Sequence, residues 1–155
     1  MYSIEPIAFV KNIRKGIEDD YWGDVISEII LSDKIPESSL TGIENYSHLE
    51  IIYYFHLADP SEINISSSFP RENRKFPLTG IFAQRKRLRP NLLGATIVKL
   101  IKADKNSLTV SGLDAINETP VIDIKPVLKE FLPLGETEQP DWSTELMKEY
   151  WSVKK

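Results

Sequence analysis

The chain has 155 residues, of which 41% are hydrophobic and 27% are charged, so it is long enough to bury a core, and disorder is not expected. It contains no cysteine, which excludes disulfides, thiolate metal sites and cysteine nucleophiles, and its two histidines leave little room for a zinc site. A formal net charge of -4 argues against an extended basic surface for nucleic acids, although it allows a local basic site.

Targeting and membrane signals are missing from the sequence. Residues 1–16 lack the apolar run and the small-residue cleavage site of a signal peptide. No apolar stretch approaches the ~20 residues that a membrane-spanning helix needs. We therefore expect a cytoplasmic protein that uses neither a membrane nor a metal ion.

Seven short runs rich in β-branched and aromatic residues predict strands, with turn residues between them. In chain order they cover residues 4–10, 25–31, 48–56, 79–85, 95–103, 108–113 and 120–125. Pro6 indicates an edge or a strand start. Residues 48–56 are apolar enough for a strand buried on both faces, whereas 108–113 alternate like a half-buried strand. Seven strands with so little helix predict an all-β barrel or sandwich.

Two further segments stand apart from the strands. Residues 57–78 are polar, contain three prolines and predict a long loop, and such loops in compact domains tend to be functional or mobile. Residues 143–151 carry apolar side chains at helical spacing after an N-terminal Ser or Thr, which predicts a C-terminal helix. We expect residues 1–155 to form one domain.

Three motif blocks resemble the TsaA-like (TrmO) family of S-adenosylmethionine-dependent methyltransferases. The first is GIFAQRKRLRPNLLG at 80–94, with the family's Phe-Ala, Arg and Arg-Pro-Asn elements. The second is GLDAINETPVIDIKP at 112–126, and the third is Ser47-His48-Leu49, which opens the strand that ends at His56. The blocks keep the family's order and spacing, and the chain is similar to a short subgroup without the C-terminal domain of longer members.

This resemblance implies the architecture and the activity. The expected fold is a single-sheet, closed or nearly closed β-barrel of about seven strands with short peripheral helices. The expected assembly is a homodimer that binds S-adenosyl-L-methionine near the subunit interface. The expected reaction is methylation of the exocyclic nitrogen of threonylcarbamoyl-adenosine in tRNA, next to the anticodon.

The resemblance also implies which residues bind the cofactor. They are Tyr21, Trp22, His56, Leu57, Phe82, Arg85, Ala95, Asp114, Ala115, Ile116 and Asn117. A guanidinium such as that of Arg85 pairs bidentately with a carboxylate, and Asp114 could accept from ribose hydroxyls or from an ammonium group. The alternatives are a surface cation at a strand end for Arg85 and a hairpin turn for Asp114. As isolated aromatics, Tyr21 and Trp22 would more often be core or interface residues than a face for the sulfonium or the adenine.

Residues for the methyl acceptor are less clearly marked. Asp123 is the candidate base and Lys125 a candidate orienting cation. A strand-end ion pair between them is the favoured alternative, and positioning alone could suffice. Lys86, Arg87 and Arg89 could contact RNA phosphates. Alternatively, Arg89 braces the turn at 90–91 and the other two are solvated.

Two other functions are compatible with the sequence. The acceptor could be a small molecule, because the chain resembles members without the extra C-terminal domain, its net charge is negative, and Lys86 and Arg87 stand where the family usually has small residues. The chain could also be a non-catalytic, OB-like RNA-binding barrel, since small barrels with basic loops and aromatic residues bind single strands.

Overall fold

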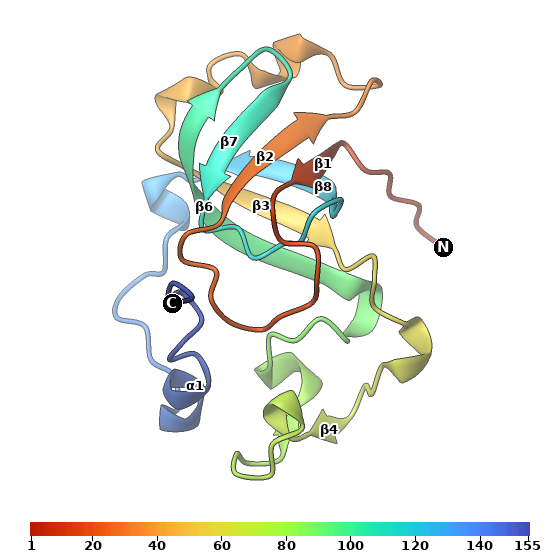
Figure 1. Ribbon diagram of the computed structural model, residues 1–155, viewed down its shortest axis with the longest axis vertical. Helices are drawn as coiled ribbons and strands as arrows, with labels where there is room; N and C mark the ends of the chain where they lie inside the picture. Colours follow the sequence, from red (N-terminus) through yellow and green to blue (C-terminus); the bar gives the residue numbers. More distant parts are fainter.

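The computed structural model describes residues 1–155 and contains a closed antiparallel barrel of six strands in the order β1-β2-β7-β6-β3-β8 (Figure 1). The strands are β1 (Ala8–Lys11), β2 (Ile26–Leu31), β3 (His48–Tyr54), β6 (Leu93–Ala103), β7 (Ser107–Ser111) and β8 (Pro120–Pro126). The sheet closes because β1 pairs with both β2 and β8. The predicted all-β, single-sheet barrel is therefore confirmed, with six strands instead of about seven.

The remaining elements are short. A two-stranded sheet pairs β4 (Ser67–Ser68) with β5 (Thr79–Gly80), and the one α-helix is α1 (Asp141–Leu146). The 3-10 helices are η1 (Glu37–Leu40), η2 (Ile43–Asn45), η3 (Pro60–Glu62), η4 (Pro70–Glu72), η5 (Ile81–Ala83), η6 (Pro90–Leu92) and η7 (Lys129–Phe131).

The core fills the inside of the barrel. Alternate residues of each strand point inward, as the period of two requires, and they join residues from η1 and from the β7–β8 loop in one apolar cluster. Its members are Ala8, Val10, Ile29, Leu31, Leu40, Leu49, Ile51, Tyr53, Val98, Leu108, Val110, Leu113, Ala115 and Val121. Leu40 lies at the end where β6 finishes, beside Ala103. Tyr53 lies at the opposite end, opposite Gly94 at the start of β6.

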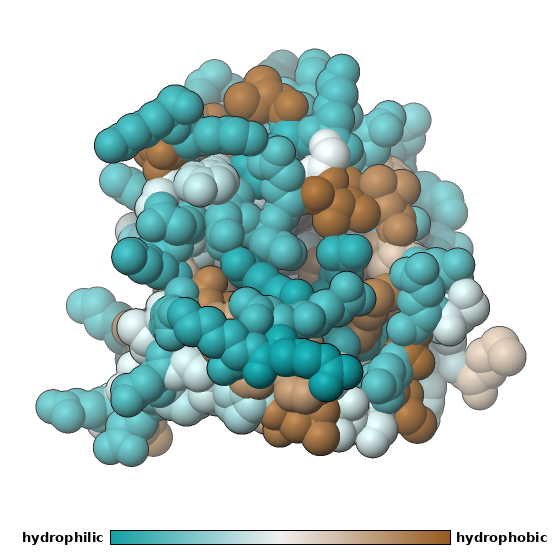
Figure 2. Space-filling model, turned by 60° about the horizontal axis from the view of Figure 1, so that its bottom comes forward, coloured by the Kyte–Doolittle hydropathy of each residue, from teal (hydrophilic) through white to brown (hydrophobic).

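Two regions lie beneath the Tyr53 end of the barrel (Figure 1). We call residues 57–92 the lower lobe and residues 140–154 the C-terminal strap. They contact each other through the rings of Phe76 and Trp142, whose centroids are 6.2 Å apart, and through a 2.5 Å ion pair between Lys75 and Glu145. Figure 2 shows this side of the molecule, where hydrophilic residues predominate and apolar residues form separate patches.

The predicted strand over 79–85 is wrong for most of its length. Only Thr79 and Gly80 pair in a ladder, and the chain then turns into η5. Ile81 is buried in the lower lobe, and the side-chain amide of Gln84 donates to the Thr79 carbonyl at 2.7 Å. Apolar character predicted a strand here, but the residues pack around a turn that the Gln84 amide closes.

Three other predicted elements differ in detail. The strand predicted over 4–10 begins only at Ala8, two residues after Pro6, which has no amide to donate. Along β3, buried residues alternate with half-buried ones, so only one face is fully buried, because a closed barrel has a single inside. Residues 108–111 alternate as predicted, but β7 ends at Ser111, and Leu113 beyond it joins the core.

The C-terminal helix starts earlier and is shorter than the predicted 143–151. It ends at Leu146, and residues 147–151 form turns. The carbonyl of Glu149 accepts from the Tyr21 amide at 3.1 Å, and that of Tyr150 accepts from the Trp22 amide at 2.8 Å. These carbonyls bond to another part of the chain, so the segment leaves the helix to make contacts that a local pattern does not contain.

Candidate functional site

A cluster of polar side chains surrounds the carboxylate of Asp114, in the loop between β7 and β8 at the Tyr53 end of the barrel. Its Oδ1 atom accepts hydrogen bonds from the Tyr53 hydroxyl, at 3.0 Å, and from the Thr96 hydroxyl. Its Oδ2 atom accepts one from the hydroxyl of Tyr150 in the C-terminal strap. A carboxylate has about four acceptor positions. Three are occupied by the chain, and the position that remains is on Oδ2.

Strand alternation brings Tyr53 and Thr96 to this carboxylate. Both side chains point inward, because they share the parity of the buried residues Ile51 and Val98. Tyr53 pairs with Gly94 across β3 and β6, and a Cβ atom at Gly94 would lie 2.5 Å from the Tyr53 ring. Glycine at position 94 therefore leaves the space in which the phenol reaches Asp114.

The two tyrosines remain neutral hydrogen-bond donors at this site. Burial raises the pKa of the Tyr53 hydroxyl above its usual value, and the negative charge of Asp114 adds to the rise. The same two causes, in the same order, raise the pKa of Tyr150. The positive charge of Arg85 opposes both shifts, which places its guanidinium within electrostatic range of the cluster.

Arg85 is held next to the cluster by the start of β6. One Nη atom donates to the Ala95 carbonyl at 2.6 Å, and Ala95 precedes Thr96 in the strand. The side chain is otherwise exposed, and its other N–H groups have no acceptor in the chain. A carboxylate and a guanidinium of opposite charge thus converge, and three of the predicted cofactor residues, Arg85, Ala95 and Asp114, lie in one neighbourhood.

The other predicted residues of the β7–β8 loop are partly occupied by the chain itself. The Asn12 side chain donates to the Ala115 carbonyl at 2.8 Å, and the Asn117 amide donates to the Arg14 carbonyl at 2.6 Å. The amides of Ala115 and Ile116 donate to no atom of the chain. The amides of Gly112, Leu113 and Asp114 also have no acceptor in the chain, so the free backbone donors of this loop run from residue 112 to residue 116.

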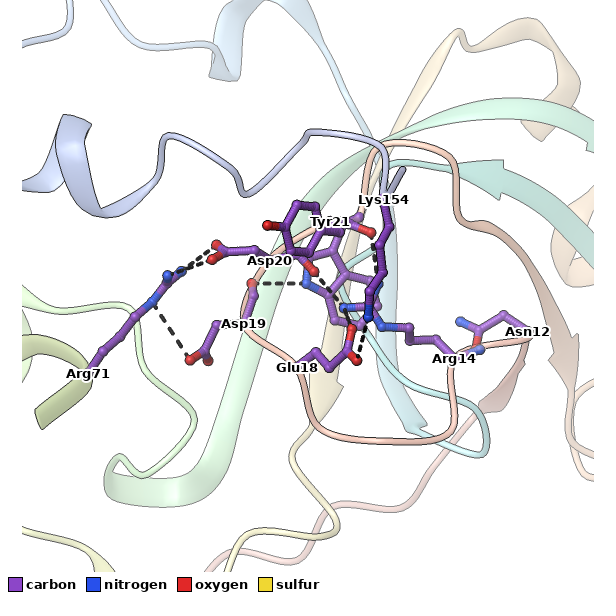
Figure 3. Close-up of polar contacts among 9 residues, drawn as sticks. Asn12, Arg14, Glu18, Asp19, Asp20, Tyr21, Arg71 and Lys154 are labelled. Atoms are coloured by element: carbon purple, nitrogen blue, oxygen red, sulfur yellow. Dashed lines mark hydrogen bonds and ion pairs between the residues drawn. The ribbon is translucent and has the colours of Figure 1, made fainter.

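Residues 12–23 form a loop between β1 and β2 that contains Trp22 and positions Tyr21 (Figure 3). The Arg14 guanidinium donates to the Tyr21 carbonyl at 2.8 Å and lies 4.1 Å from the centre of the Trp22 ring. Arg71 of the lower lobe makes two hydrogen bonds to the Asp20 carboxylate, at 2.8 and 2.9 Å. Trp22 is only 3% exposed, and the guanidinium of Arg14 lies over its ring. The indole is therefore not accessible to a ligand in this structure.

Three further predicted cofactor residues, His56, Leu57 and Phe82, make no side-chain hydrogen bond to the Asp114 cluster. His56 and Leu57 follow Phe55, the first residue after β3; His56 is half-buried and Leu57 is 56% exposed. Phe82 lies on η5 and is 80% exposed. The structure gives His56 and Phe82 no side-chain hydrogen bond or ring contact, so their predicted roles rest on position alone.

The basic run divides into paired and unpaired cations. Lys86 donates to the Ser68 hydroxyl at 2.9 Å, and Arg89 donates to the Gln84 carbonyl at 2.9 Å, which braces the turn before β6. The side chain of Arg87 has no hydrogen-bond partner or ion pair in the chain. Of the three predicted substrate-binding cations, Arg87 is the one whose side chain makes no hydrogen bond or ion pair within the chain.

Asp123 and Lys125 form an ion pair of 2.5 Å on β8, and their side chains are 42% and 56% exposed. Hydrogen bonding to Asp123 raises the pKa of Lys125 above its usual value. Asp123 also accepts from the Ile124 amide at 2.9 Å. These contacts match the ion-pair alternative more closely than a free base.

Two expected absences can be compared with the structure. No group of three or more His, Cys, Asp or Glu residues is arranged to hold a metal ion. No helix has the length and apolar character needed to cross a membrane.

The family of the chain follows from a match between residues 16–131 and the model of the tRNA-methyltransferase O N-terminal domain. The matched range contains all three motif blocks, Arg85 and Asp114. The chain belongs to the TrmO N-terminal domain family. The resemblance that the sequence motifs indicated is thereby confirmed.

Individual relatives of this TrmO-family chain fall into long and short proteins. The human tRNA (adenine(37)-N6)-methyltransferase is 40% identical over 96 residues, which are 62% of this chain but 21% of that protein. The chain thus spans about a fifth of that relative's length. A probable S-adenosyl-L-methionine-binding protein of Methanothermobacter thermautotrophicus is 39% identical over 135 residues, which cover 85% of this chain and 94% of the relative.

Solved structures support the fold of this TrmO-family chain. A crystal structure of TrmO from Pseudomonas aeruginosa superposes with a TM-score of 0.69 at 24% identity, covering 89% of this chain and 61% of the other. The similarity extends over most of the barrel and its attached segments.

Sequence reasoning missed the hydroxyl groups around Asp114. Tyr53 reads as one more aromatic residue of an apolar strand, and Tyr150 as part of the apolar stripe of a helix. One signal was present: Gly94 interrupts an apolar run opposite the end of β3, where glycine commonly marks a close approach.

Proposed function

We propose that this chain is an S-adenosyl-L-methionine-dependent methyltransferase that acts on an adenine of tRNA. The observation that carries the proposal is the convergence of Arg85 and Asp114 in a member of the TrmO N-terminal domain family. The names of the human and archaeal relatives, which include an adenine N6-methyltransferase and a cofactor-binding protein, support it.

The side chains around Asp114 fit the polar groups of this cofactor. The free N–H groups of Arg85 suit the carboxylate of its methionine part. Asp114 offers an acceptor for a ribose hydroxyl or the ammonium group, and the amides of Ala115 and Ile116 offer donors for a base edge. The bound cofactor supplies an electrophilic methyl group, and the residues of the chain hold it and exclude water.

Positioning is the main chemical contribution that we assign to the protein. Transfer forms a carbon–nitrogen bond, breaks the carbon–sulfur bond and releases one proton from the acceptor nitrogen. Near-attack alignment at about 3–3.5 Å supplies much of the acceleration in such displacements. Because Asp123 is paired with Lys125, we propose that this proton passes to solvent, without a dedicated base.

Finer features of the function are also proposals. The acceptor is the N6 atom of threonylcarbamoyl-adenosine next to the anticodon, with Arg87 on a phosphate. The active form is a cytoplasmic homodimer with the cofactor near the interface. Large apolar side chains that stay exposed on one chain, among them Phe131 at 83% and Leu134 at 95%, support burial between two copies.

Arg85→Ala tests the proposed function most directly. We expect it to weaken binding of S-adenosylhomocysteine by about tenfold to a hundredfold, because a hydrogen bond to a charged group contributes roughly 1.5–3 kcal/mol. Arg87→Ala is the matched control from the same run. It should retain cofactor affinity, weaken tRNA binding and reduce the salt slope by about one. Isothermal calorimetry and filter binding measure these quantities.

Two results would overturn parts of this proposal. A folded wild-type protein that binds neither S-adenosylmethionine nor S-adenosylhomocysteine would overturn the cofactor assignment. Mass spectrometry of tRNA nucleosides from cells with and without the gene tests the acceptor. If every methylated adenosine persists without the gene and labelled methyl enters only low-mass compounds, the acceptor is a small molecule.

A further inference from the structure

The C-terminal strap covers the carboxylate that we assign to the ligand. Tyr150 donates its hydroxyl to Oδ2 of Asp114, which also has the one acceptor position still open. Two hollows of the surface lie elsewhere, one bordered by η1 and the 103–105 turn and the other by β1 and Glu118. Asp114 lines neither of them.

Two neighbouring ribose hydroxyls need two acceptor positions if both donate to Asp114. Tyr53 and Thr96 occupy both acceptor positions of Oδ1, and Tyr150 occupies one of the two acceptor positions of Oδ2. Only one position remains while the strap is docked, so a cis-diol cannot donate both hydrogen bonds. The Tyr150 hydroxyl therefore stands where a ligand hydroxyl would bind.

The strap is attached by contacts that are easily broken. Its ion pairs, Lys75 with Glu145 and Lys154 with Glu18, join side chains that are each 46% or more exposed. Exposed pairs of this kind contribute about 0–1 kcal/mol. α1 has six residues, fewer than the roughly 12–15 that an isolated helix needs to be even marginal. Local opening of such a segment requires much less free energy than unfolding the barrel.

A glycine permits the strap to dock. The backbone of Tyr21 and Trp22 donates to the carbonyls of Glu149 and Tyr150, which brings the next strap residue, Trp151, onto Gly23. A Cβ atom at Gly23 would lie 2.0 Å from the Trp151 carbonyl oxygen. Figure 1 shows the C-terminus beside the loop that contains Gly23, and Figure 3 shows Lys154 reaching Glu18 of the same loop.

We propose that the C-terminal strap is an autoinhibitory gate, in which Tyr150 imitates a ligand hydroxyl on Asp114 and must leave before a cis-diol ligand binds with both hydroxyls. This rests on the proposed function, because the ligand is the ribose of S-adenosylmethionine or S-adenosylhomocysteine. The apparent affinity then equals the intrinsic affinity multiplied by the fraction of molecules whose strap is open.

Two variants open the gate by different routes. Tyr150→Phe removes the hydroxyl that donates to Oδ2 of Asp114 and keeps the ring. Gly23→Ala displaces the strap through the added Cβ atom and leaves the Asp114 and Tyr150 side chains unmutated. Tyr46→Phe and Gly16→Ala are the matched controls. The Tyr46 hydroxyl makes no hydrogen bond in the chain, and a Cβ atom at Gly16 meets nothing within 4 Å.

Calorimetry with S-adenosylhomocysteine and hydrogen exchange of strap amides in the full chain test the gate. We expect both opening variants to bind about tenfold more tightly than wild type, the gain expected when one charge-assisted hydrogen bond no longer competes. The controls should bind like wild type. S-adenosylhomocysteine should also accelerate exchange at residues 146–152 of wild type.

The alternative outcomes separate the gate from the proposed function. If wild type binds the ligand and both opening variants bind equally or more weakly, the gate is wrong and the cofactor assignment stands. Ligand-induced protection of residues 146–152 would also overturn the gate, because the strap would then close on the ligand. If no protein binds the ligand, the cofactor assignment fails and the gate fails with it.

Discussion

The barrel and the C-terminal strap are stabilised by different interactions. In the barrel, six paired strands enclose a cluster of 14 buried residues. In the strap, most side chains are exposed, and short polar contacts attach it to the loop at 12–23, the lower lobe and Asp114. Apolar burial therefore determines whether the chain folds, whereas the strap contacts determine how open the Asp114 site is.

The largest expected difference between the two regions concerns stability. Ile51→Ala removes a core side chain with no exposed surface and should lower the free energy of unfolding by about 2–5 kcal/mol. Ile97→Ala, on the outer face of β6 at 50% exposure, is the matched control and should cost less than about 1 kcal/mol. Leu146→Ala in the strap should resemble the control. Urea unfolding measures all three, and a loss from Leu146→Ala as large as that from Ile51→Ala would contradict the comparison.

A second variant acts where the barrel meets the site. Gly94→Ala places a Cβ atom 2.5 Å from the Tyr53 ring, so the ring or the strand pairing must shift. We expect a loss of about 1–3 kcal/mol in stability, as for other overpacked positions, together with weaker binding of S-adenosylhomocysteine. Gly80→Ala, where a Cβ atom meets nothing within 4 Å, should change neither quantity. Unchanged stability and ligand affinity in Gly94→Ala would show that Tyr53 does not need this space.

The smallest effect should appear at alkaline pH. Folding raises the pKa of Tyr53 and Tyr150 above the unfolded value of about 10, so their contribution to stability is complete below pH 10 and is lost as pH rises above it. One unit above the unfolded value, each tyrosine accounts for about 1.4 kcal/mol. Tyr150 should ionise when the strap detaches, and Tyr53 only when the barrel unfolds.

Tyrosinate absorbance and circular dichroism, followed together, can separate these two events. In wild type, Tyr53 and Tyr150 should titrate late, and in Tyr150→Phe only Tyr53 remains of this pair. Tyr46→Phe should still show both. If Tyr150 ionises near its unfolded pKa while the strap amides stay protected, burial and the hydrogen bond to Asp114 do not raise the pKa of Tyr150.

The sequence predicted the barrel better than its surroundings. Alternation in 108–113 and β-branched residues in 25–31 are local properties, and residues 108–111 and 26–31 of these runs lie in barrel strands. The run at 79–85 has similar composition, but the packing of Ile81 and the side-chain bonds of Gln84 make it a turn. Composition thus identifies apolar runs, and tertiary contacts decide which of them pair.

Part of the candidate site could be predicted and part could not. The motifs nominated Arg85 and Asp114, which the fold places beside the same cluster. The contact of Tyr150 with Asp114 could not be predicted, because the two residues are 36 positions apart in the sequence and Tyr150 lies in turns after the end of α1. Trp22 has the residue type of a ligand-stacking aromatic, but Arg14 covers its ring, and such pairing depends on the loop's path.

The positions of the 3 tryptophans have a practical consequence. Trp142 and Trp151 belong to the strap, and Trp22 lies in the loop against which the strap docks. All three tryptophans therefore lie in the strap or in the loop that contacts it, and none lies inside the barrel. Emission from the unmodified protein should report strap movement on the millisecond scale of a stopped-flow mixer, without a label and independently of any chemical turnover.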